Sequence, residues 1–420
     1  MKQYEAYKDS GVQWLGEIPN HWEVCRVKSL FDHISGNGFK IIYQGKESGK
    51  YPFCKASDIN GNNMFISSAK NYVDDDIVNS EGYNVIPEYS ILFSKIGEAL
   101  KKNHRKINTI PCIVDNNCSA LVNHSSDNII FLYYVMNVID MAWFDNAGVI
   151  PCVNVSKLMN CGLPLPPLVE QEVIAAYLDE RVGKIDAIIT EKEAMVDQLQ
   201  QYRKSLISET VTRGLNPIVP MKDSGIDWIG QIPAHWVMVK LKYISNLQSG
   251  SNLTSEQIEE TGEYPVFGGN GLRGYYHDFN TEGDRVLIGR QGALCGNINY
   301  ASGKFWATEH AVVCHPIKQY NVIWLGSLLE IMNLNQYSIA SAQPGLSVDR
   351  IKQLEIPLPP FDEQQEIGSF IEKKDLDIRQ SISELQSQIE DLKAYKSSVI
   401  AEAVTGKVDL RDWKPSEDSA

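Results

Sequence analysis

Apolar residues recur at heptad spacing in two long stretches of the chain. No proline occurs within 168–216 or 361–414, and each stretch follows a Pro-Pro pair, whose rings fix an extended backbone. We therefore predict two helices of roughly 44 residues, each about 65 Å long at ~1.5 Å per residue. A narrow apolar seam favours pairing of these helices with each other, although each could instead pack on its own domain. The seam residues are Leu178, Val182, Ile185, Ile189, Val196, Leu199 and Leu206, then Ile371, Ile378, Ile382, Leu385, Ile389, Leu392 and Val399.

The remaining segments alternate short apolar runs with turns rich in glycine and asparagine. Runs such as 90–93 and 285–288 predict strands, and each is followed by a basic residue and a glycine. The glycine-rich segment 268–271 predicts a flexible loop. The apolar run 128–144 is interrupted by polar residues, which favours a buried helix over a membrane span. At the second long helix, Asp362 predicts an N-cap with Gln365 at N3.

Two repeats organise the chain. The segment 8–22 returns at 222–236 with ten of fifteen residues identical, an offset of 214. The segment Leu163-Pro164-Leu165-Pro166-Pro167 with the following Glu-Gln returns from Ile356 at an offset of 193. The chain therefore contains two copies of one unit with similar frames and different interiors, and the first copy is longer.

These patterns predict two mixed α/β (α+β) globular domains joined by a pair of long helices, related by a pseudo-two-fold repeat. The expected divisions are a first globular domain at 1–162, a first long helix at 163–214, a second globular domain at 215–355, a second long helix at 356–408 and a tail at 409–420. The motif 8–22 and its copy 222–236 each contain two tryptophans. We expect these tryptophans to anchor the opening strand of each copy to the core; docking of a partner is the alternative. They are Trp14, Trp22, Trp228 and Trp236.

The net charge of −14 is concentrated in the predicted helices. Residues 356–420 hold 8 basic and 14 acidic side chains, whereas residues 1–160 hold 15 and 17. A nearly neutral domain can still bind DNA through a local basic face. The eight cysteines include no C-x-x-C pair, so we expect free thiols and no metal site. An N-terminus without an apolar leader predicts a cytoplasmic protein.

No motif for DNA chemistry is present. A phosphate-binding G-x-x-x-x-G-K-[ST] loop and an Asn-Pro-Pro-aromatic methyltransferase motif are both absent from the sequence. The triplet Asp391-Leu392-Lys393 resembles part of a nuclease motif, but it lies within a heptad stretch, where a solvated helix face explains it better. We therefore predict no catalytic residue.

Basic and amide side chains gather in one segment of each predicted domain. Lysine and arginine neutralise phosphates, and arginine, asparagine and glutamine can bond two atoms of a base edge at once. These segments are the candidate DNA-binding sites, and ordinary solvated loops are the alternative. The candidates are Lys95, Lys101, Lys102, Arg105 and Lys106 in the first domain, and Asn270, Arg273, Arg290, Gln291 and Lys304 in the second.

The doubled S-G-x-x-W-[LI]-G-x-I-P-x-H-W and P-L-P-P-[LF]-x-E-Q frames resemble the specificity subunits of type I restriction–modification systems. The resemblance covers essentially the whole chain. It implies two target-recognition domains that each bind one half of a bipartite double-stranded DNA site. It also implies that the two long helices form an antiparallel coiled coil, which acts as a ruler between the domains.

The same resemblance implies partners: methyltransferase subunits that hold S-adenosylmethionine, and restriction–translocase subunits that use ATP and Mg²⁺. The duplicated helices offer two similar docking surfaces, so we predict two methyltransferase subunits per chain. The resemblance implies no cofactor on this chain, no membrane, and a location on the nucleoid of a prokaryotic cell. It supplies no fixed base-contacting residues, because the family's recognition interiors differ. A free-standing DNA-modifying enzyme and a coiled-coil scaffold without a DNA role are the alternatives.

Overall fold

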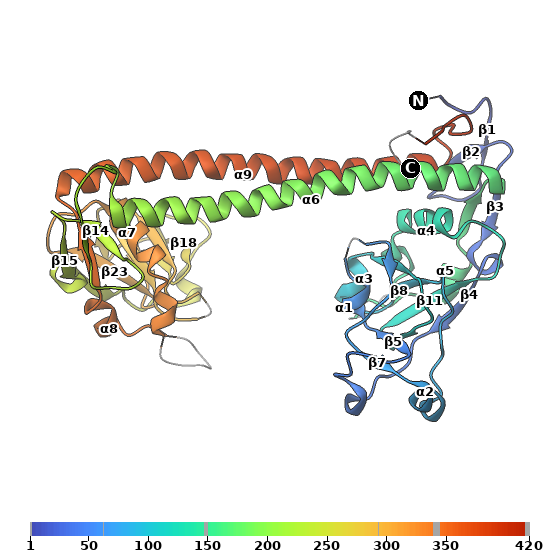
Figure 1. Cartoon of the computed structure of the whole chain (residues 1–420), viewed down its shortest axis with the longest axis horizontal. Coiled ribbons are helices and arrows are strands. Elements are labelled where there is room, and N and C mark those ends of the chain that lie inside the picture. The colour runs from blue at the N-terminus through green and yellow to red at the C-terminus, as the bar shows by residue number, and fades with distance from the viewer. Residues whose placement is uncertain (1, 62, 147–149, 293, 339–344, 416–420) are drawn as a thin grey trace. The chain divides into compact units, whose positions relative to one another are not determined.

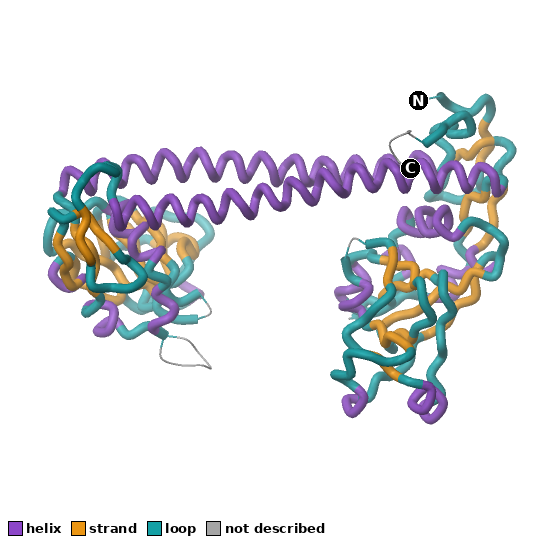
Figure 2. The backbone as a smooth tube through the Cα atoms, viewed as in Figure 1, coloured by secondary structure: helices purple, strands orange, loops and turns teal. Residues whose placement is uncertain are grey.

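The computed structural model describes the chain except residues 1, 62, 147–149, 293, 339–344 and 416–420, so the end of the predicted tail lies outside the described residues. The chain divides into two compact units. The first unit comprises Met1–Glu191 with Gln388–Ala420, and the second comprises Lys192–Ser387. Each unit holds a globule of strands and short helices together with part of both long helices (Figures 1 and 2).

One β-sheet forms the frame of each globule. In the first unit its order is β4-β11-β8-β9-β6, and in the second it is β16-β23-β20-β21. The first four strands therefore correspond one to one, and their neighbours run antiparallel in both units. The bounds are β4 Phe31–Ser35, β11 Cys118–Asn123, β8 Ile91–Ser94, β9 Arg105–Asn108 and β6 Phe65–Ile66, then β16 Ser245–Ser249, β23 Ala311–Pro316, β20 Arg285–Gly289 and β21 Ile298–Ala301.

A second sheet differs between the units. In the first unit it is the three-stranded β10-β5-β7, accompanied by helices α1 and α2. In the second unit it is the four-stranded β18-β17-β22-β19. The unlike interiors predicted from the repeats are thus two different sheets on one common frame. The bounds are β10 Ile113–Val114, β5 Tyr51–Cys54, β7 Tyr72–Val73, α1 Ala56–Ile59 and α2 Asp75–Glu81, then β18 Gly271–Tyr276, β17 Tyr264–Gly268, β22 Lys304–Ala307 and β19 Thr281–Glu282.

The segment 268–271 forms a tight hairpin, so the prediction of a flexible loop was wrong. Strands β17 and β18 pair from Gly268 to Gly271, which leaves only two residues in the turn. Gly271 has φ +96°, which glycine adopts without steric cost.

Matching hairpins and strand pairs open and close each globule. Strand β1 pairs with β2, and β3 pairs with β12; in the second unit β13 pairs with β14, and β15 with β24. The bounds are β1 Tyr7–Asp9, β2 Glu17–Pro19, β3 Glu23–Arg26 and β12 Gly162–Leu165, then β13 Met221–Asp223, β14 Gln231–Pro233, β15 Val237–Lys240 and β24 Glu355–Leu358.

The apolar run 128–144 forms a buried helix, as predicted, but a shorter one. Helix α4 spans Ile129–Val138, and its N-cap is Asn128, whose side chain accepts from two backbone N–H groups. Its counterpart α7 spans Val322–Ile331. The remaining short helices are α3 Glu98–Lys101, α5 Val155–Met159 and α8 Val348–Lys352, with 3-10 helices η1 Val27–Ser29, η2 Ile41–Tyr43, η3 Met141–Phe144, η4 Leu241–Tyr243, η5 Ser255–Gln257 and η6 Leu334–Tyr337.

The long helices are α6, Leu168–Arg213, and α9, Phe361–Val404. In the first unit Lys396 Nζ lies 2.7 Å from Asp186 Oδ1, and in the second Arg203 is bonded to Asp375. Residue numbers rise along α6 as they fall along α9, so the two helices pack antiparallel. All fourteen predicted seam residues are buried or half-buried, which confirms the seam.

The start of α9 differs from the prediction. The helix begins at Phe361, and the N–H of Gln364 donates to the carbonyl of Pro360 at 3.0 Å. Asp362 therefore lies in the first turn instead of at the N-cap. The extended Pro-Pro pair itself ends at the cap position, because the proline carbonyl accepts the first helical hydrogen bond.

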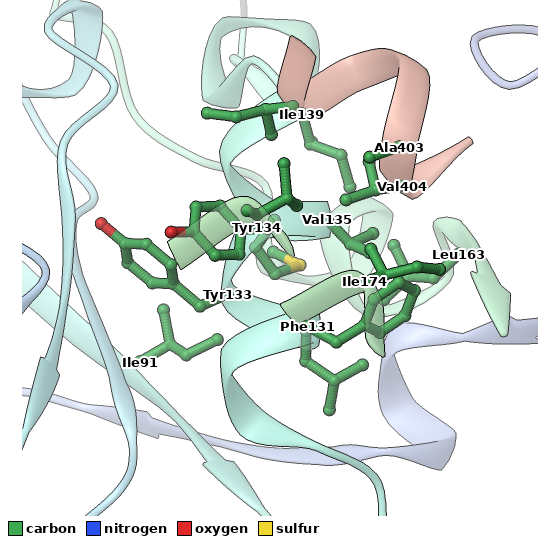
Figure 3. Close-up of a cluster of buried hydrophobic side chains, with 14 of the residues drawn as sticks. Ile91, Phe131, Tyr133, Tyr134, Val135, Ile139, Leu163, Ile174, Ala403 and Val404 are labelled. Atoms are coloured by element: carbon green, nitrogen blue, oxygen red, sulfur yellow. The ribbon is translucent and has the colours of Figure 1, made fainter. Parts of the chain in front are cut away.

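In the first unit α4 lies at the centre of the core between the frame sheet and the long helices. Figure 3 shows Phe131 and Val135 of α4 next to Ile174 of α6 and Val404 of α9. These side chains are at most 1% exposed. The core of the second unit repeats this arrangement with Trp324 and Leu328 of α7 and Ile367 of α9.

Candidate nucleic-acid interface

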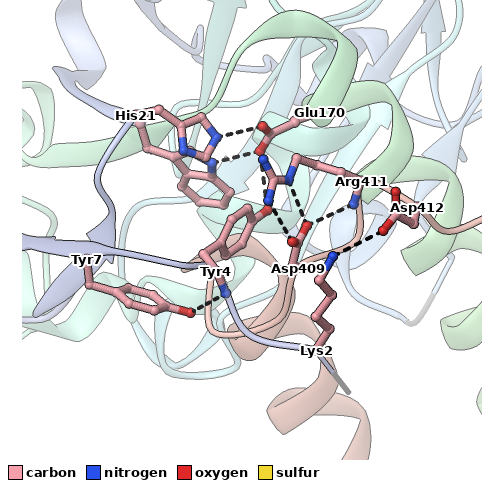
Figure 4. Close-up of polar contacts among 9 residues, drawn as sticks. Lys2, Tyr4, Tyr7, His21, Glu170, Asp409, Arg411 and Asp412 are labelled. Atoms are coloured by element: carbon pink, nitrogen blue, oxygen red, sulfur yellow. Dashed lines mark hydrogen bonds and ion pairs between the residues drawn. The ribbon is translucent and has the colours of Figure 1, made fainter.

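A glutamate at the start of each long helix fixes the globule to that helix. Glu170 accepts from the indole N–H of Trp22 at 2.8 Å and lies 2.6 Å from His21 Nε2 (Figure 4). Glu363 makes the same contacts, at the same distances, with Trp236 and His235. This geometry explains why the His-Trp and Glu-Gln motifs occur in both copies.

The adjacent glutamine forms a second link. Gln171 Oε1 accepts from the N–H of Asn128 at 2.9 Å, and Gln364 Oε1 accepts from the N–H of Asn321 at 3.1 Å. Each glutamine therefore joins the long helix to the residue that caps the buried helix.

Three of the four repeat tryptophans have the predicted anchoring role. Trp22 and Trp236 are fully buried. Trp14 is half-buried and donates to the carbonyl of Gly162 at 3.2 Å, whereas Trp228 is exposed and differs from the expectation.

The N-terminal and C-terminal segments meet in the first unit (Figure 4). Lys2 pairs with Asp412, and the guanidinium of Arg411 lies 5.1 Å from the ring centroid of Tyr4. The Tyr4 hydroxyl donates to Glu170 at 3.2 Å. The predicted tail thus extends the junction around Glu170.

In the second unit the fold brings three candidate residues together. Asn270, Arg273 and Gln291 line one surface hollow of about 450 Å³. Asn270 comes from the β17–β18 turn, Arg273 from β18, and Gln291 from the segment after β20. Leu272, Leu294 and His310 also line the hollow, and both leucines are 55% exposed. The hollow therefore presents amide, guanidinium and methyl groups to solvent.

The other two candidates of the second unit lie outside this hollow. Arg290 Nη1 donates to Ser249 Oγ at 3.3 Å. Lys304 is exposed on β22, with its ammonium 4.5 Å from the ring centroid of Phe279.

In the first unit three of the five candidates reach solvent. Lys101 and Lys102 are exposed, and Lys101 pairs with Glu98 one helical turn away at 2.7 Å. Lys95 is half-buried, and its Nζ donates to Ser35 Oγ at 3.2 Å.

Arg105 and Lys106 differ from the expectation of an exposed basic loop. They begin strand β9 and are 2% and 8% exposed. The Arg105 guanidinium donates to the carbonyl of Ile139 at 2.6 Å and to Asn103, and burial lowers its pKa to about 10. Arg105 thus ties the end of α4 to the sheet. The sequence gives no sign of this, since a lysine–arginine run outside a clear apolar alternation reads as a loop.

Several residues at these sites were missed by the sequence argument. Ser35 and Ser249 were not singled out, yet the Ser-Gly pairs 35–36 and 249–250 keep the offset of 214 found at the tryptophan motif. Extending that repeat by thirteen residues would have found them. His310 and the two leucines carry no signal in the sequence.

A larger cleft of about 1020 Å³ lies in the first unit, where β6 and α4 face α6 and α9. Asp179 lines it and accepts from the Tyr134 hydroxyl at 2.8 Å, and burial raises the pKa of this carboxyl. Among the described residues, no three His, Cys, Asp or Glu side chains come close enough to hold a metal ion. Of the helices in that same described part, none has the length and apolarity needed to cross a bilayer.

The model of one protein family matches most of the chain. The type I restriction modification DNA specificity domain matches twice, over residues 19–198 and 233–391. These two matches fall on the two repeats.

Known relatives agree with this match. The type I restriction enzyme EcoprrI specificity subunit of Escherichia coli is 40% identical over 163 residues, which cover 38% of this chain and 40% of that relative, so this match spans about two fifths of its length. The type I restriction enzyme MjaVIII specificity subunit of Methanocaldococcus jannaschii is 22% identical over 428 residues, covering 94% of this chain and 95% of that protein.

A solved structure has the same fold. It is described as showing the structural basis of complex assembly and conformational transition of the type I R-M system, and one of its chains matches with a TM-score of 0.70 at 15% identity. The match covers 93% of this chain and 99% of that one. The chain therefore belongs to the type I restriction–modification DNA specificity family, as a specificity subunit that contains the family's domain twice.

Proposed function

We propose that each globule binds one half of a bipartite double-stranded DNA site, and that α6 and α9 set the number of unread base pairs between the halves. As a specificity subunit the chain is itself non-catalytic, and the cofactors S-adenosylmethionine, ATP and Mg²⁺ belong to other subunits of the complex. The observation that carries the proposal is the common frame sheet with a different second sheet in each unit. Two domains that recognise different DNA sequences can share one scaffold but need two different contact surfaces.

In the second unit we assign base contacts to the hollow around Asn270, Arg273 and Gln291. Asparagine and glutamine can bond both N6 and N7 of adenine, and arginine can bond O6 and N7 of guanine. The exposed methyl groups of Leu272 and Leu294 suit contact with a thymine methyl group. Lys304 contributes general attraction to the phosphates.

In the first unit we assign phosphate contacts to Lys101 and Lys102, which are exposed. Arg105 and Lys106 support this surface from within the fold, because their side chains are buried.

The two junctions support the proposal of two methyltransferase subunits per chain. The Trp22–Glu170 and Trp236–Glu363 junctions repeat with the same distances, so each unit offers a similar surface beside its long helices. Restriction–translocase subunits then join the assembly on prokaryotic cytoplasmic DNA.

The test starts from a library of DNA duplexes with random sequences. The chain, reconstituted with its methyltransferase subunits, is used to select the duplexes that it binds, and these are sequenced. We expect the wild type to select two specified blocks with a fixed gap. Arg273→Ala and Gln291→Ala should each relax one block and leave the other intact, at about 1–3 kcal/mol per lost base contact.

Gln353→Ala is the matched control, since Gln353 is an exposed glutamine of the same unit at the end of α8, outside the hollow. It should leave both blocks unchanged. Relaxation of both blocks by a single hollow variant would contradict the assignment of one half-site to each globule.

A further inference from the structure

Both globules place a cation beside a serine at the same point of the frame sheet. In the first unit Lys95, just after β8, donates from Nζ to Oγ of Ser35, the last residue of β4, at 3.2 Å. In the second unit Arg290, just after β20, donates from Nη1 to Oγ of Ser249, the last residue of β16, at 3.3 Å.

The backbone holds each cation by the same pair of hydrogen bonds. The N–H of Lys95 donates to Asn117 at 2.8 Å, and its carbonyl accepts from Val153 at 2.9 Å. The N–H of Arg290 donates to His310 at 2.8 Å, and its carbonyl accepts from Leu346 at 2.9 Å. Val153 and Leu346 are themselves equivalent positions of the second repeat. The cation is therefore held by equivalent connecting segments in the two units, and none of these four partners belongs to the second sheet.

The backbone next to the serine has the same close packing in the two units. A Cβ atom on Gly36 would lie 1.9 Å from the carbonyl oxygen of Asp115, and one on Gly250 would lie 2.1 Å from that of Ala307. Only glycine permits this close backbone approach, so the Ser-Gly pair has one geometry in both globules.

The two cations remain available to a ligand. Both are half-buried, and within the described part of the chain neither forms an ion pair with a carboxylate. Lys101, by contrast, pairs with Glu98. A partly desolvated cation beside a hydroxyl is a common arrangement for binding a phosphate oxygen.

We infer that Lys95 with Ser35, and Arg290 with Ser249, form two equivalent sites for a backbone phosphate of double-stranded DNA, one in each globule. The inference rests on the proposed function and deepens it. Two domains that read different bases must differ where they touch base edges, yet the DNA backbone is the same for both. The constant contact lies beside the last residue of β4 and β16, whereas the base contacts proposed for the second unit come from the β17–β18 turn, β18 and the segment after β20. Arg290, for which the sequence left both a base contact and a phosphate contact open, is thereby assigned to a phosphate.

The experiment measures binding of the reconstituted complex to its own site over a range of salt concentrations. Lys95→Met and Arg290→Met should each lower the magnitude of the slope of log K against log salt by about 0.9, and the double variant by about 1.8. The methylated sequence should stay the same in all three variants. Lys95→Arg and Arg290→Lys keep the charge and should keep the slope.

Lys28→Met and Lys242→Met are the matched controls. These two lysines occupy equivalent positions in η1 and η4, just before β4 and β16, and their replacement should leave the slope unchanged. Should a methionine variant not fold, Ser35→Ala and Ser249→Ala test the same site, with weaker binding expected.

Two results would overturn the inference: an unchanged slope in both methionine variants, or a changed methylation sequence in one half-site, which would identify a base contact. The proposed function fails separately, if the wild-type complex itself shows no selective binding to two blocks.

Discussion

At the scale of single residues, the carboxylates of Glu170 and Glu363 link each globule to the start of a long helix. Each accepts from a buried indole N–H and contacts a histidine. The sequence marked these residues, because the His-Trp and Glu-Gln motifs recur, but it did not show that they contact each other. Sequence patterns identify which residues two copies share, whereas contacts across 148 and 127 residues depend on the fold.

Glu170→Ala is expected to lower the unfolding free energy of the first unit by about 1–3 kcal/mol, because it leaves the buried Trp22 N–H without its acceptor. Urea denaturation followed by tryptophan fluorescence measures this change. Glu170→Gln keeps an acceptor oxygen and should cost less.

Glu172→Ala, an exposed neighbour on the same helix, is the control and should stay within about 0.5 kcal/mol of the wild type. Equal losses for Glu170→Ala and Glu172→Ala would show that the junction does not stabilise the unit.

Arg105 illustrates the limit of prediction at this scale. Its charge suggested an exposed contact, yet it bonds the end of α4 from inside the core. Asn270, Arg273 and Gln291 were grouped by chemistry alone, and the fold does bring them to one hollow. The difference is that β9 lies inside its sheet between β8 and β6, whereas the β17–β18 turn is exposed.

At the scale of elements, the long helices could be predicted and the strands only in part. A heptad pattern over forty residues leaves few alternatives, and its seam is buried as expected. Short apolar runs such as 90–93 predict a strand but not its partner, since pairing of β8 with β11 and β9 is a non-local choice. The start of α9 depended on one hydrogen bond at Pro360, which no periodicity encodes.

The length of the helix pair should set the number of base pairs between the two half-sites. Inserting one heptad after Gln198 in α6 and one before Gln380 in α9 places both inserts five residues from the Arg203–Asp375 contact, so the antiparallel pairing and the seam are kept. The added ~10 Å of helix corresponds to about three base pairs. Methylome sequencing should show the gap between the two blocks lengthened by about that number, with some loss of activity because the second globule also turns around the duplex.

A four-residue insertion at the same two places is the control, since it moves the apolar seam to another face and should abolish activity. An active heptad variant that still methylates sites with the original gap would refute the claim that the helices set the gap. It would not affect the claim that each globule binds one half-site.

At the scale of the whole molecule, the duplication was the most informative feature of the sequence. It predicted two globules with alike frames, and the strand orders β4-β11-β8-β9 and β16-β23-β20-β21 bear this out. It could not predict how the interiors differ, because no repeat relates β10-β5-β7 to β18-β17-β22-β19. The predicted division into separate helical and globular domains stays a prediction, and the compact units instead each include part of both helices.

The central claim is that two globules of one chain each specify half of a DNA site. Methylome sequencing of cells that carry this chain with its methyltransferase subunits, compared with cells that lack only this chain, tests it most directly. The account predicts one chain-dependent motif made of two specified blocks, separated by a gap of fixed length and no sequence preference. A continuous motif, or methylation that persists without the chain, would contradict it.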